Sequence, residues 1–246
     1  MIRSILVVIY LVLFVLFVGI PVIFYAALTG AVDTLYRVAL RALRGMLWLA
    51  GVRVRVEGLE NVPPGVCVFV ANHTSNSDPP ALVVAIPKRV SLLAKKEVFR
   101  VPVLATAFRL AGIVPVDRGD RDSAAASVDT AIQALKSGLS FLVYPEGTRS
   151  PDGRLLPFKK GTFVMAIEAG VPIVPISVGG AQKIMRKGEL AIHPGEIVVK
   201  FHPSVDASRY TLEQRAELLE RVQAAVAAGL PEDQQPTAAA KETASA

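Results

Sequence analysis

Residues 66–78 read Val-Cys-Val-Phe-Val-Ala-Asn-His-Thr-Ser-Asn-Ser-Asp. The first six residues form an apolar run with the length and the Val/Phe content of a buried strand. The next seven are polar, and they place His73, one of only three histidines, five residues before Asp78. A strand that ends in a histidine-containing turn, with an aspartate just beyond, is one way to build an oriented general base.

The spacing of this pair decides how it can be used. On a continuous helix, residues five apart lie about 140° from each other, so His73 and Asp78 can meet only across a turn. The polar residues 74–77 supply that turn, and Pro79 suits the first turn of a following helix. The carboxylate can then accept from one ring nitrogen and leave the other as a base. The simpler alternative is that Asp78 only caps a helix and His73 is a polar residue at a strand end.

Two other kinds of site have weaker support. A metal site is disfavoured because His193 and His202 lie far off in the sequence and no pair of ligands has helical spacing. Ser75 and Ser77 are candidate acyl-enzyme nucleophiles, although the chain has no Gly-x-Ser-x-Gly elbow. The single cysteine, Cys67, excludes an internal disulfide and is expected to be inert core.

A second polar turn, residues 144–149 (Tyr-Pro-Glu-Gly-Thr-Arg), also follows an apolar run, residues 139–143. Two such turns predict one site on one edge of a sheet. Apolar runs alternate with helical patterns along the chain, which predicts an α/β fold with a central, largely parallel or mixed sheet flanked by helices. The expected strands are residues 52–56 (an edge strand), 66–71, 90–94, 112–116, 139–144, 173–178 and 197–201, and the expected helices are residues 79–85, 97–111, 121–136, 160–169 and 211–228.

The N-terminal segment carries much of the 52% hydrophobic content. Residues 5–28 contain no charge, and at about 1.5 Å per helical residue they can cross a bilayer core of roughly 30 Å. A cleaved signal peptide is the alternative, but its apolar region is normally shorter. Gly19 and Pro21 can bend the helix, so both a full span and a half-inserted hairpin are open.

The next segment, residues 33–49, reads as an amphipathic helix with Asp33 as its N-cap. Its basic stripe and Trp48 suit the headgroup interface of a membrane, and the alternative is an ordinary helix packed on the domain. The stripe consists of Arg37, Arg41 and Arg44. The formal net charge of +6 favours anionic partners such as a lipid surface, while 7% aromatics and no binding motif argue against nucleic acid. The basic residues around 37–55 predict a cytoplasmic location for the globular part.

The polar turns carry a family resemblance. Residues 72–78, with His-x4-Asp, resemble the first motif of the glycerolipid acyltransferases, in particular the lysophosphatidic acid acyltransferases. Residues 112–118 (Gly-Ile-Val-Pro-Val-Asp-Arg), 144–150 and 171–176 (Val-Pro-Ile-Val-Pro-Ile) are similar to the later motifs, in the same order. The resemblance implies an O-acyltransferase of phospholipid biosynthesis that moves a fatty acyl group from a thioester to the sn-2 hydroxyl of 1-acyl-glycerol-3-phosphate, giving phosphatidic acid. The second motif departs from the family at Pro115 and Val116, where a bulkier apolar residue is common.

The resemblance also implies roles for individual residues. His73 would be the general base for the acceptor hydroxyl and Asp78 would orient it, with no covalent enzyme intermediate. Arg118 and Arg149 would bind the acceptor phosphate, as guanidinium groups suit phosphate. The rest of the expected substrate site is Glu146, Gly147, Thr148, Lys95 and Lys96.

Some of these roles have alternatives. Glu146 would either contact a hydroxyl or hold Arg149. Lys95 and Lys96 would attract phosphates of either substrate or belong to a solvated charge run. Residues 171–175 are expected to form a strand and an apolar wall for the acyl chain.

The resemblance implies no bound cofactor, with an acyl-CoA or acyl-carrier-protein thioester as co-substrate and membrane lysophosphatidic acid as the other partner. The predicted organisation is a membrane-binding helical segment (residues 1–50), an acyltransferase domain (51–229) and a disordered tail (230–246). Three alternatives remain: another lysophospholipid or lyso-aminolipid acceptor, a membrane-bound lipid hydrolase or thioesterase, and a catalytically silent membrane-binding module.

Overall fold

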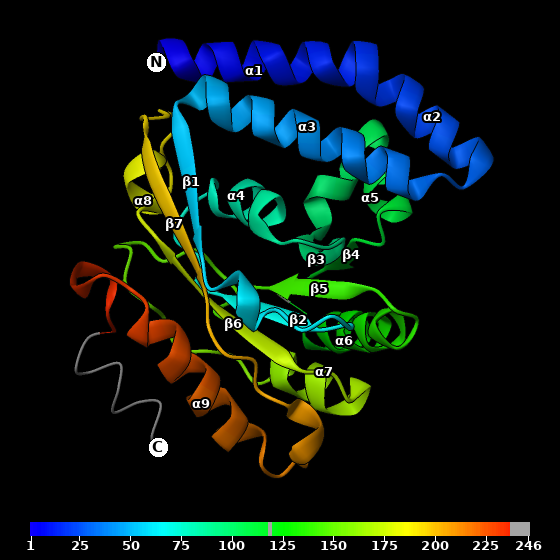
Figure 1. The fold of residues 1–246 in the computed structure, drawn as a ribbon. Coiled ribbons are helices and arrows are strands. Elements are labelled where there is room, and N and C mark those ends of the chain that lie inside the picture. The colour runs from blue at the N-terminus through cyan, green and yellow to red at the C-terminus, as the bar shows by residue number, and fades with distance from the viewer. Residues whose placement is uncertain (118–119, 237–246) are drawn as a thin grey trace.

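The computed structural model describes residues 1–117 and 120–236, and within them the strands form one seven-stranded sheet. The strands are β1 (Val52–Glu57), β2 (Val68–Ala71), β3 (Val90–Lys95), β4 (Val114–Val116), β5 (Ser140–Val143), β6 (Ile173–Gly179) and β7 (Gly195–Phe201). Their order is β1-β7-β6-β2-β5-β3-β4 (Figure 1). The strands from β6 to β4 are all parallel, whereas β7 is antiparallel to β6 and pairs with β1 in parallel. The sheet is therefore mixed, and β1 is an edge strand, as predicted.

Helices cover both faces of the sheet, as Figure 1 shows. They are α4 (Asp78–Ala85), α5 (Pro102–Leu110), α6 (Arg121–Lys136), α7 (Gly161–Ala169), α8 (Ala181–Ile184) and α9 (Arg215–Ala228). Strand β2 is buried on both sides: Phe69 packs in the core under α4, and Val70 packs in the core under α6, α7 and α9. A strand covered on both faces needs a continuous apolar run, which is why residues 66–71 show no alternation.

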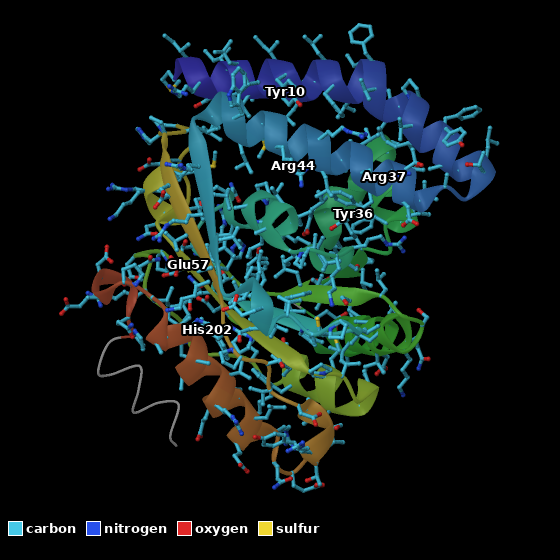
Figure 2. The ribbon with its side chains drawn as sticks, in the orientation of Figure 1. Tyr10, Tyr36, Arg37, Arg44, Glu57 and His202 are labelled. Atoms are coloured by element: carbon cyan, nitrogen blue, oxygen red, sulfur yellow. The ribbon has the colours of Figure 1, made fainter. Side chains whose placement is uncertain are left out.

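The N-terminal 50 residues form a helical hairpin across one end of the domain (Figure 1). The chain passes through α1 (Ile2–Phe14), a π-helical turn (Val15–Gly19) and α2 (Ile20–Thr29), then reverses at Gly30 into α3 (Val32–Ala50). The helix axis bends where α1 passes into α2, the region where Gly19 and Pro21 were expected to bend it. Figure 2 shows Tyr10 of α1 above α3, where Gly45 permits the close approach: a Cβ added there would lie 2.3 Å from the Tyr10 hydroxyl oxygen.

One face of this hairpin is docked and the other is apolar and exposed. Val7 is buried in the same core as Phe69, and Ser4 Oγ accepts a hydrogen bond of 3.0 Å from the Ile192 amide. These contacts dock the segment on the folded domain. Residues Ile2–Thr29 are long and apolar enough to cross a membrane, and side chains such as Phe17 (74% exposed) point away from the protein. Such a surface indicates membrane association.

Three predictions of local structure need correction. The helix expected at residues 97–111 is broken into a 3₁₀ segment (Lys96–Arg100) and α5, because Pro102 cannot continue a helix and fits a first turn. Asp33 is not the N-cap of α3, which is Ala31; it lies in the first turn and pairs with Arg89 at 3.0 Å.

The predicted disorder of the tail is wrong for residues 230–236. Leu230 is buried against α9, and Gln234 is fully buried, with its side-chain amide bonded to the backbone of Gly153 and Gly180. Residues 237–246 lie outside the described part of the chain.

Candidate active site

The turn after β2 is fixed at its first residue by a neighbouring strand. Asn72 donates from Nδ2 to the Val178 carbonyl (3.0 Å) and accepts at Oδ1 from the Val178 amide (2.8 Å). The amide side chain thus continues the β2–β6 pairing by one step after the β2 backbone has turned away. His73 is the next residue, so it lies at the carboxyl edge of the parallel strands directly after a residue that two hydrogen bonds hold in place.

Asp78 closes the turn back onto His73. Its Oδ2 lies 2.9 Å from His73 Nδ1 and also accepts from the amides of Thr74 (2.7 Å) and Ser75 (2.8 Å). The carboxylate is fully buried. The pair therefore meets across a turn, as its spacing required. Asp78 does hold backbone amides, but they belong to the turn rather than to the first turn of α4.

The second polar turn, residues 144–149, and the following Ser150 hydrogen-bond to the backbone of His73. Glu146 accepts from the His73 amide (2.6 Å) and from the Leu156 amide (3.2 Å), and the Ser150 amide donates to the His73 carbonyl (2.8 Å). Glu146 is 3% exposed, and burial raises its pKa to about 8 against the opposing effect of the two amides. Glu146 makes no hydrogen bond or ion pair with Arg149 among the described residues, so the expected hold on Arg149 is not formed. Its contact with a substrate hydroxyl stays a prediction.

Tyr144 is a site residue that the sequence analysis missed. Its ring stacks on the His73 imidazole, with centroids 4.1 Å apart and planes 22° from parallel. Burial raises the pKa of the Tyr144 hydroxyl well above its usual value. The only signal in the sequence was its place at the head of the turn 144–149. With Nδ1 held by Asp78 and one face covered by Tyr144, His73 keeps Nε2 without a hydrogen-bond partner among the described residues.

The two serines of the turn are structural. Ser75 Oγ donates to the Met185 carbonyl (2.7 Å) and also contacts Ser77 Oγ (2.8 Å), and Ser77 Oγ donates to the Ala181 carbonyl (3.4 Å). These bonds tie the turn to α8 and direct the Ser75 proton away from His73. An acyl-enzyme nucleophile at Ser75 or Ser77 does not fit this arrangement.

The other expected substrate residues lie around the same edge. Gly147 has φ +70°, a left-handed conformation that favours glycine, and Thr148 is exposed while Arg149 is half-buried. Lys95 Nζ lies 3.5 Å from Glu97 Oε1. Lys96 forms a surface ion pair with Asp117, which links the ends of β3 and β4. Arg118 lies outside the described residues.

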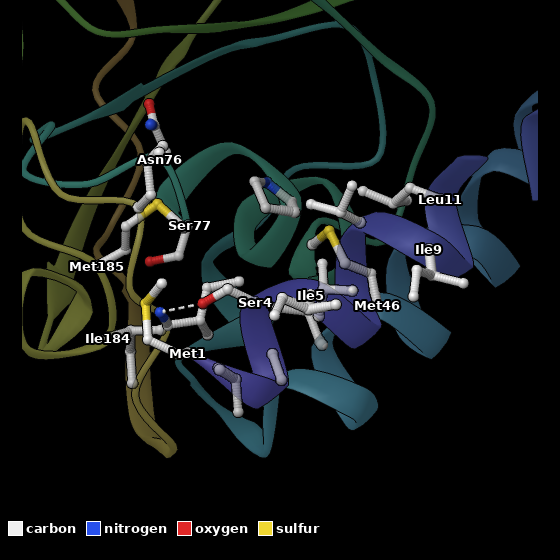
Figure 3. A pocket seen from close by; sticks show the side chains of 18 residues that line it. Met1, Ser4, Ile5, Ile9, Leu11, Met46, Asn76, Ser77, Ile184 and Met185 are labelled. Carbon is white, nitrogen blue, oxygen red and sulfur yellow. Dashed lines mark hydrogen bonds between the residues drawn. The ribbon is translucent and has the colours of Figure 1, made fainter.

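An apolar pocket of about 520 Å³ runs from this turn to the N-terminal hairpin. Figure 3 shows Ser77 and Met185 at one end, and Ile5 of α1 and Met46 of α3 further along. Residues 171–175 lead into the central strand β6, which confirms the expected strand, but they do not line this pocket, as a wall for the acyl chain would.

The remaining histidines serve elsewhere. His202 directly follows β7 and lies between β6 and α9 (Figure 2), where Ser177 Oγ accepts from its Nε2 (2.7 Å) and donates to the Val226 carbonyl (2.6 Å). Burial lowers the pKa of His202. His193 is exposed. Within residues 1–117 and 120–236, no group of three or more His, Cys, Asp or Glu side chains is placed to hold a metal ion.

Comparison with known proteins agrees with this geometry. The acyltransferase family model matches residues 53–179, just over half of the chain. The 1-acyl-sn-glycerol-3-phosphate acyltransferase of Limnanthes douglasii is 31% identical over 192 residues, which are 78% of this chain and 68% of the relative. The alpha enzyme of that name from Homo sapiens is 34% identical over 189 residues, 74% of this chain and 67% of the relative.

A solved structure is similar over nearly the whole chain. The crystal structure of the 1-acyl-sn-glycerophosphate acyltransferase PlsC from Thermotoga maritima superposes with a TM-score of 0.74 at 27% identity, covering 91% of this chain and 95% of that one. The family match, the shared fold and the His73–Asp78 pair agree on one chemistry. The chain belongs to the glycerolipid acyltransferase family, whose members are O-acyltransferases.

Proposed function

We propose that this protein transfers a fatty acyl group from an acyl thioester to the free sn-2 hydroxyl of 1-acyl-glycerol-3-phosphate, giving phosphatidic acid. The relatives described above carry this acceptor in their names. The observation that carries the proposal is the 2.9 Å contact between His73 Nδ1 and Asp78 Oδ2, which leaves Nε2 without a hydrogen bond to any described residue. Asn76 and Ser77 of the same turn line the apolar pocket.

The chemistry follows from this pair. Asp78 holds the proton on Nδ1, so the lone pair of Nε2 takes the proton of the acceptor hydroxyl as its oxygen attacks the thioester carbonyl carbon. The tetrahedral intermediate then collapses, the C–S bond breaks, and the departing sulfur takes the proton from the imidazolium. The products are an ester and a free thiol. General-base assistance of this kind contributes about 10²–10⁴-fold to the rate.

Several residues around the pair have supporting roles in this proposal. Glu146 is a positioning residue that holds the His73 amide. Arg149, Lys95 and Lys96 attract the acceptor phosphate from the side of β5 and β3. Gly147 provides the backbone turn that brings Arg149 to the edge of the sheet.

In this proposal, the N-terminal hairpin holds the site at a membrane. Its exposed apolar side chains enter the bilayer, and the exposed arginines of α3 face anionic headgroups at the cytoplasmic surface. Figure 2 shows Arg37 and Arg44 along α3. The apolar pocket between this hairpin and the catalytic turn would take a fatty acyl chain directly from the lipid.

A matched pair of histidine variants tests the base. His73→Ala should lower thioester-dependent acylation of 1-acyl-glycerol-3-phosphate by about 10²-fold or more. His193→Ala, at an exposed position away from the turn, should match the unsubstituted protein. Retained activity in His73→Ala, with a melting curve like that of the control, would show that His73 is not the base.

A panel of acceptors separates the proposed function from its alternatives. With labelled acyl-CoA and several lysolipids, the phosphate-monoester acceptor should give the most product. Arg149→Ala should raise the KM for that acceptor most strongly, because it removes a charge-assisted contact. Thioester consumption that needs no lysolipid would indicate a hydrolase, and lipid binding without turnover would indicate a binding module.

A further inference from the structure

A second, polar cleft opens beside the catalytic turn. It has a volume of about 420 Å³ and is lined by Thr74 and Ser150, among others. Thr74 follows His73 in the sequence, and the Ser150 amide donates a hydrogen bond to the His73 carbonyl. The apolar pocket lies along the same turn but is lined by Asn76 and Ser77. The catalytic turn therefore has an apolar cavity at one end and a polar cleft at the other.

The side chains of the cleft carry an excess of positive charge. Its cations outnumber its carboxylates four to two: Arg154, Lys183, Arg186 and Lys187 against Asp152 and Asp233. Asp152 is occupied within its own loop, where it accepts from Ser150 Oγ (2.9 Å) and the Arg154 amide (3.0 Å). Arg186 is exposed, and its guanidinium has no hydrogen bond or ion pair with any described residue. An unpaired guanidinium at the rim of a cleft suits a phosphate.

Deeper in the cleft, two polar atoms lack partners. Thr74 is 2% exposed, and its Oγ1 has no hydrogen-bond partner among the described residues; the same holds for Gln182 Oε1. Both side chains line the cleft. Because buried polar atoms are nearly always hydrogen-bonded, two orphans in one cleft indicate a ligand that supplies the missing groups. That ligand needs neutral polar groups, such as amides, near His73 and negative charge further out.

The topology indicates which substrate this is. The residues proposed to attract the acceptor phosphate follow β5 and β3, on one side of β2. Residues 150–154 of the cleft also follow β5, but its Gln182, Lys183 and Arg186 follow β6, on the other side of β2. Direct transfer without a covalent intermediate requires both substrates at His73 together, so the second anion-binding site is left for the acyl donor.

We propose, on the basis of the function proposed above, that this cleft binds the phosphopantetheine arm of the acyl donor. The amides of the arm would meet Thr74 and Gln182, and its phosphate would meet Arg186 and the neighbouring lysines. Coenzyme A and acyl-carrier protein both present this arm, so the cleft serves either source of the thioester. The acyl chain then lies toward the apolar pocket and the thioester carbon lies at His73.

Steady-state kinetics with truncated donors test the proposal on the full-length chain. The KM is measured for acyl-CoA, S-acyl-phosphopantetheine and S-acyl-pantetheine, and separately for the acceptor. Arg186→Glu should raise the KM of the two phosphorylated donors by about 10–100-fold, the range of a charge-assisted hydrogen bond, and should not shift that of S-acyl-pantetheine. Arg186→Lys should recover most of the loss. Lys136→Glu, an equal charge change at the exposed end of α6, is the matched control.

The outcomes separate the two proposals. A rise in the acceptor KM alone, or equal KM values for every donor in Arg186→Glu and Lys136→Glu, would overturn the assignment of the cleft. If the unsubstituted protein makes no acylated product with any donor, the proposed function fails; in that case the dissociation constant of CoA itself, measured by calorimetry, still tests the cleft. Running the same series with acyl-carrier protein shows which source gives the larger shift, and a shift with either source supports the site.

Discussion

Replacing Asp78 by asparagine isolates the charge of the His73–Asp78 pair. Oδ2 takes all three of the N–H contacts that reach Asp78, from His73, Thr74 and Ser75, while Oδ1 has no partner among the described residues. An asparagine can therefore keep its carbonyl oxygen at the Oδ2 position and its amide nitrogen at the Oδ1 position. The turn should survive, and only the negative charge beside His73 is lost.

We expect Asp78→Asn to lower the turnover number by about 10²–10⁴-fold, equivalent to roughly 3–5 kcal/mol of transition-state stabilisation, because the imidazolium loses its counter-charge. Its free energy of unfolding should stay within about 1 kcal/mol of the unsubstituted protein. Asp78→Ala should lose turnover to a similar extent and, unlike Asp78→Asn, should lose about 2–6 kcal/mol of stability, because it leaves the buried amides of Thr74 and Ser75 without acceptors.

Release of free thiol from acyl-CoA gives the rate, and denaturant unfolding in the same detergent gives the stability. The informative comparison is between the two variants, since both lose the charge but only alanine loses the turn contacts. If Asp78→Asn turns over within about threefold of the unsubstituted protein, the carboxylate serves only to hold the turn, and the reasoning about the base is refuted.

Three further variants test other parts of the structure. Folding raises the pKa of Glu146 from 4.5 to about 8, so the unfolded chain releases this proton at lower pH than the folded protein does. The free energy of unfolding should therefore fall by up to about 5 kcal/mol as the pH rises from 4.5 to 8. Glu146→Gln should remove this pH dependence, measured by denaturant unfolding at about pH 5 and about pH 8.5. Replacing Arg37, Arg41 and Arg44 by Gln removes three positive charges and, at roughly 1 kcal/mol per charge, should weaken binding to anionic vesicles by about 10²-fold in flotation assays, with no loss on zwitterionic vesicles. Equal loss on both kinds of vesicle would contradict an electrostatic role. Gly147→Ala should lower the free energy of unfolding by about 1–2 kcal/mol, because φ is +70° and the new Cβ would lie 2.9 Å from Lys159 Nζ. An unchanged melting temperature would refute the idea that this turn requires glycine.

Much of the site was accessible from the sequence because its central contact is local. His73 and Asp78 are five residues apart, so helical geometry alone showed that they meet only across a turn. The run of residues 66–71 indicated a strand buried on both faces, and the polar turn after each buried strand indicated the carboxyl edge of a parallel sheet. The apolar stretch before Thr29 similarly needed only length and composition to be read as a membrane segment.

The tertiary structure decided the contacts that span the chain. Glu146 is 73 residues from His73, and its role as a holder of the His73 amide depends on β5 lying next to β2. Tyr144 stacks on His73 for the same reason, and the cleft beside Thr74 exists only because β6 lies on the other side of β2. Periodicity and propensity report which segments form strands, but the order of strands in a sheet is set by how all the helices pack on both faces. The sequence alone therefore determined most of the strands and helices, the apolar N-terminal segment and the local His73–Asp78 pair, whereas the contacts that orient His73 and the clefts beside it arose only when the sheet was assembled.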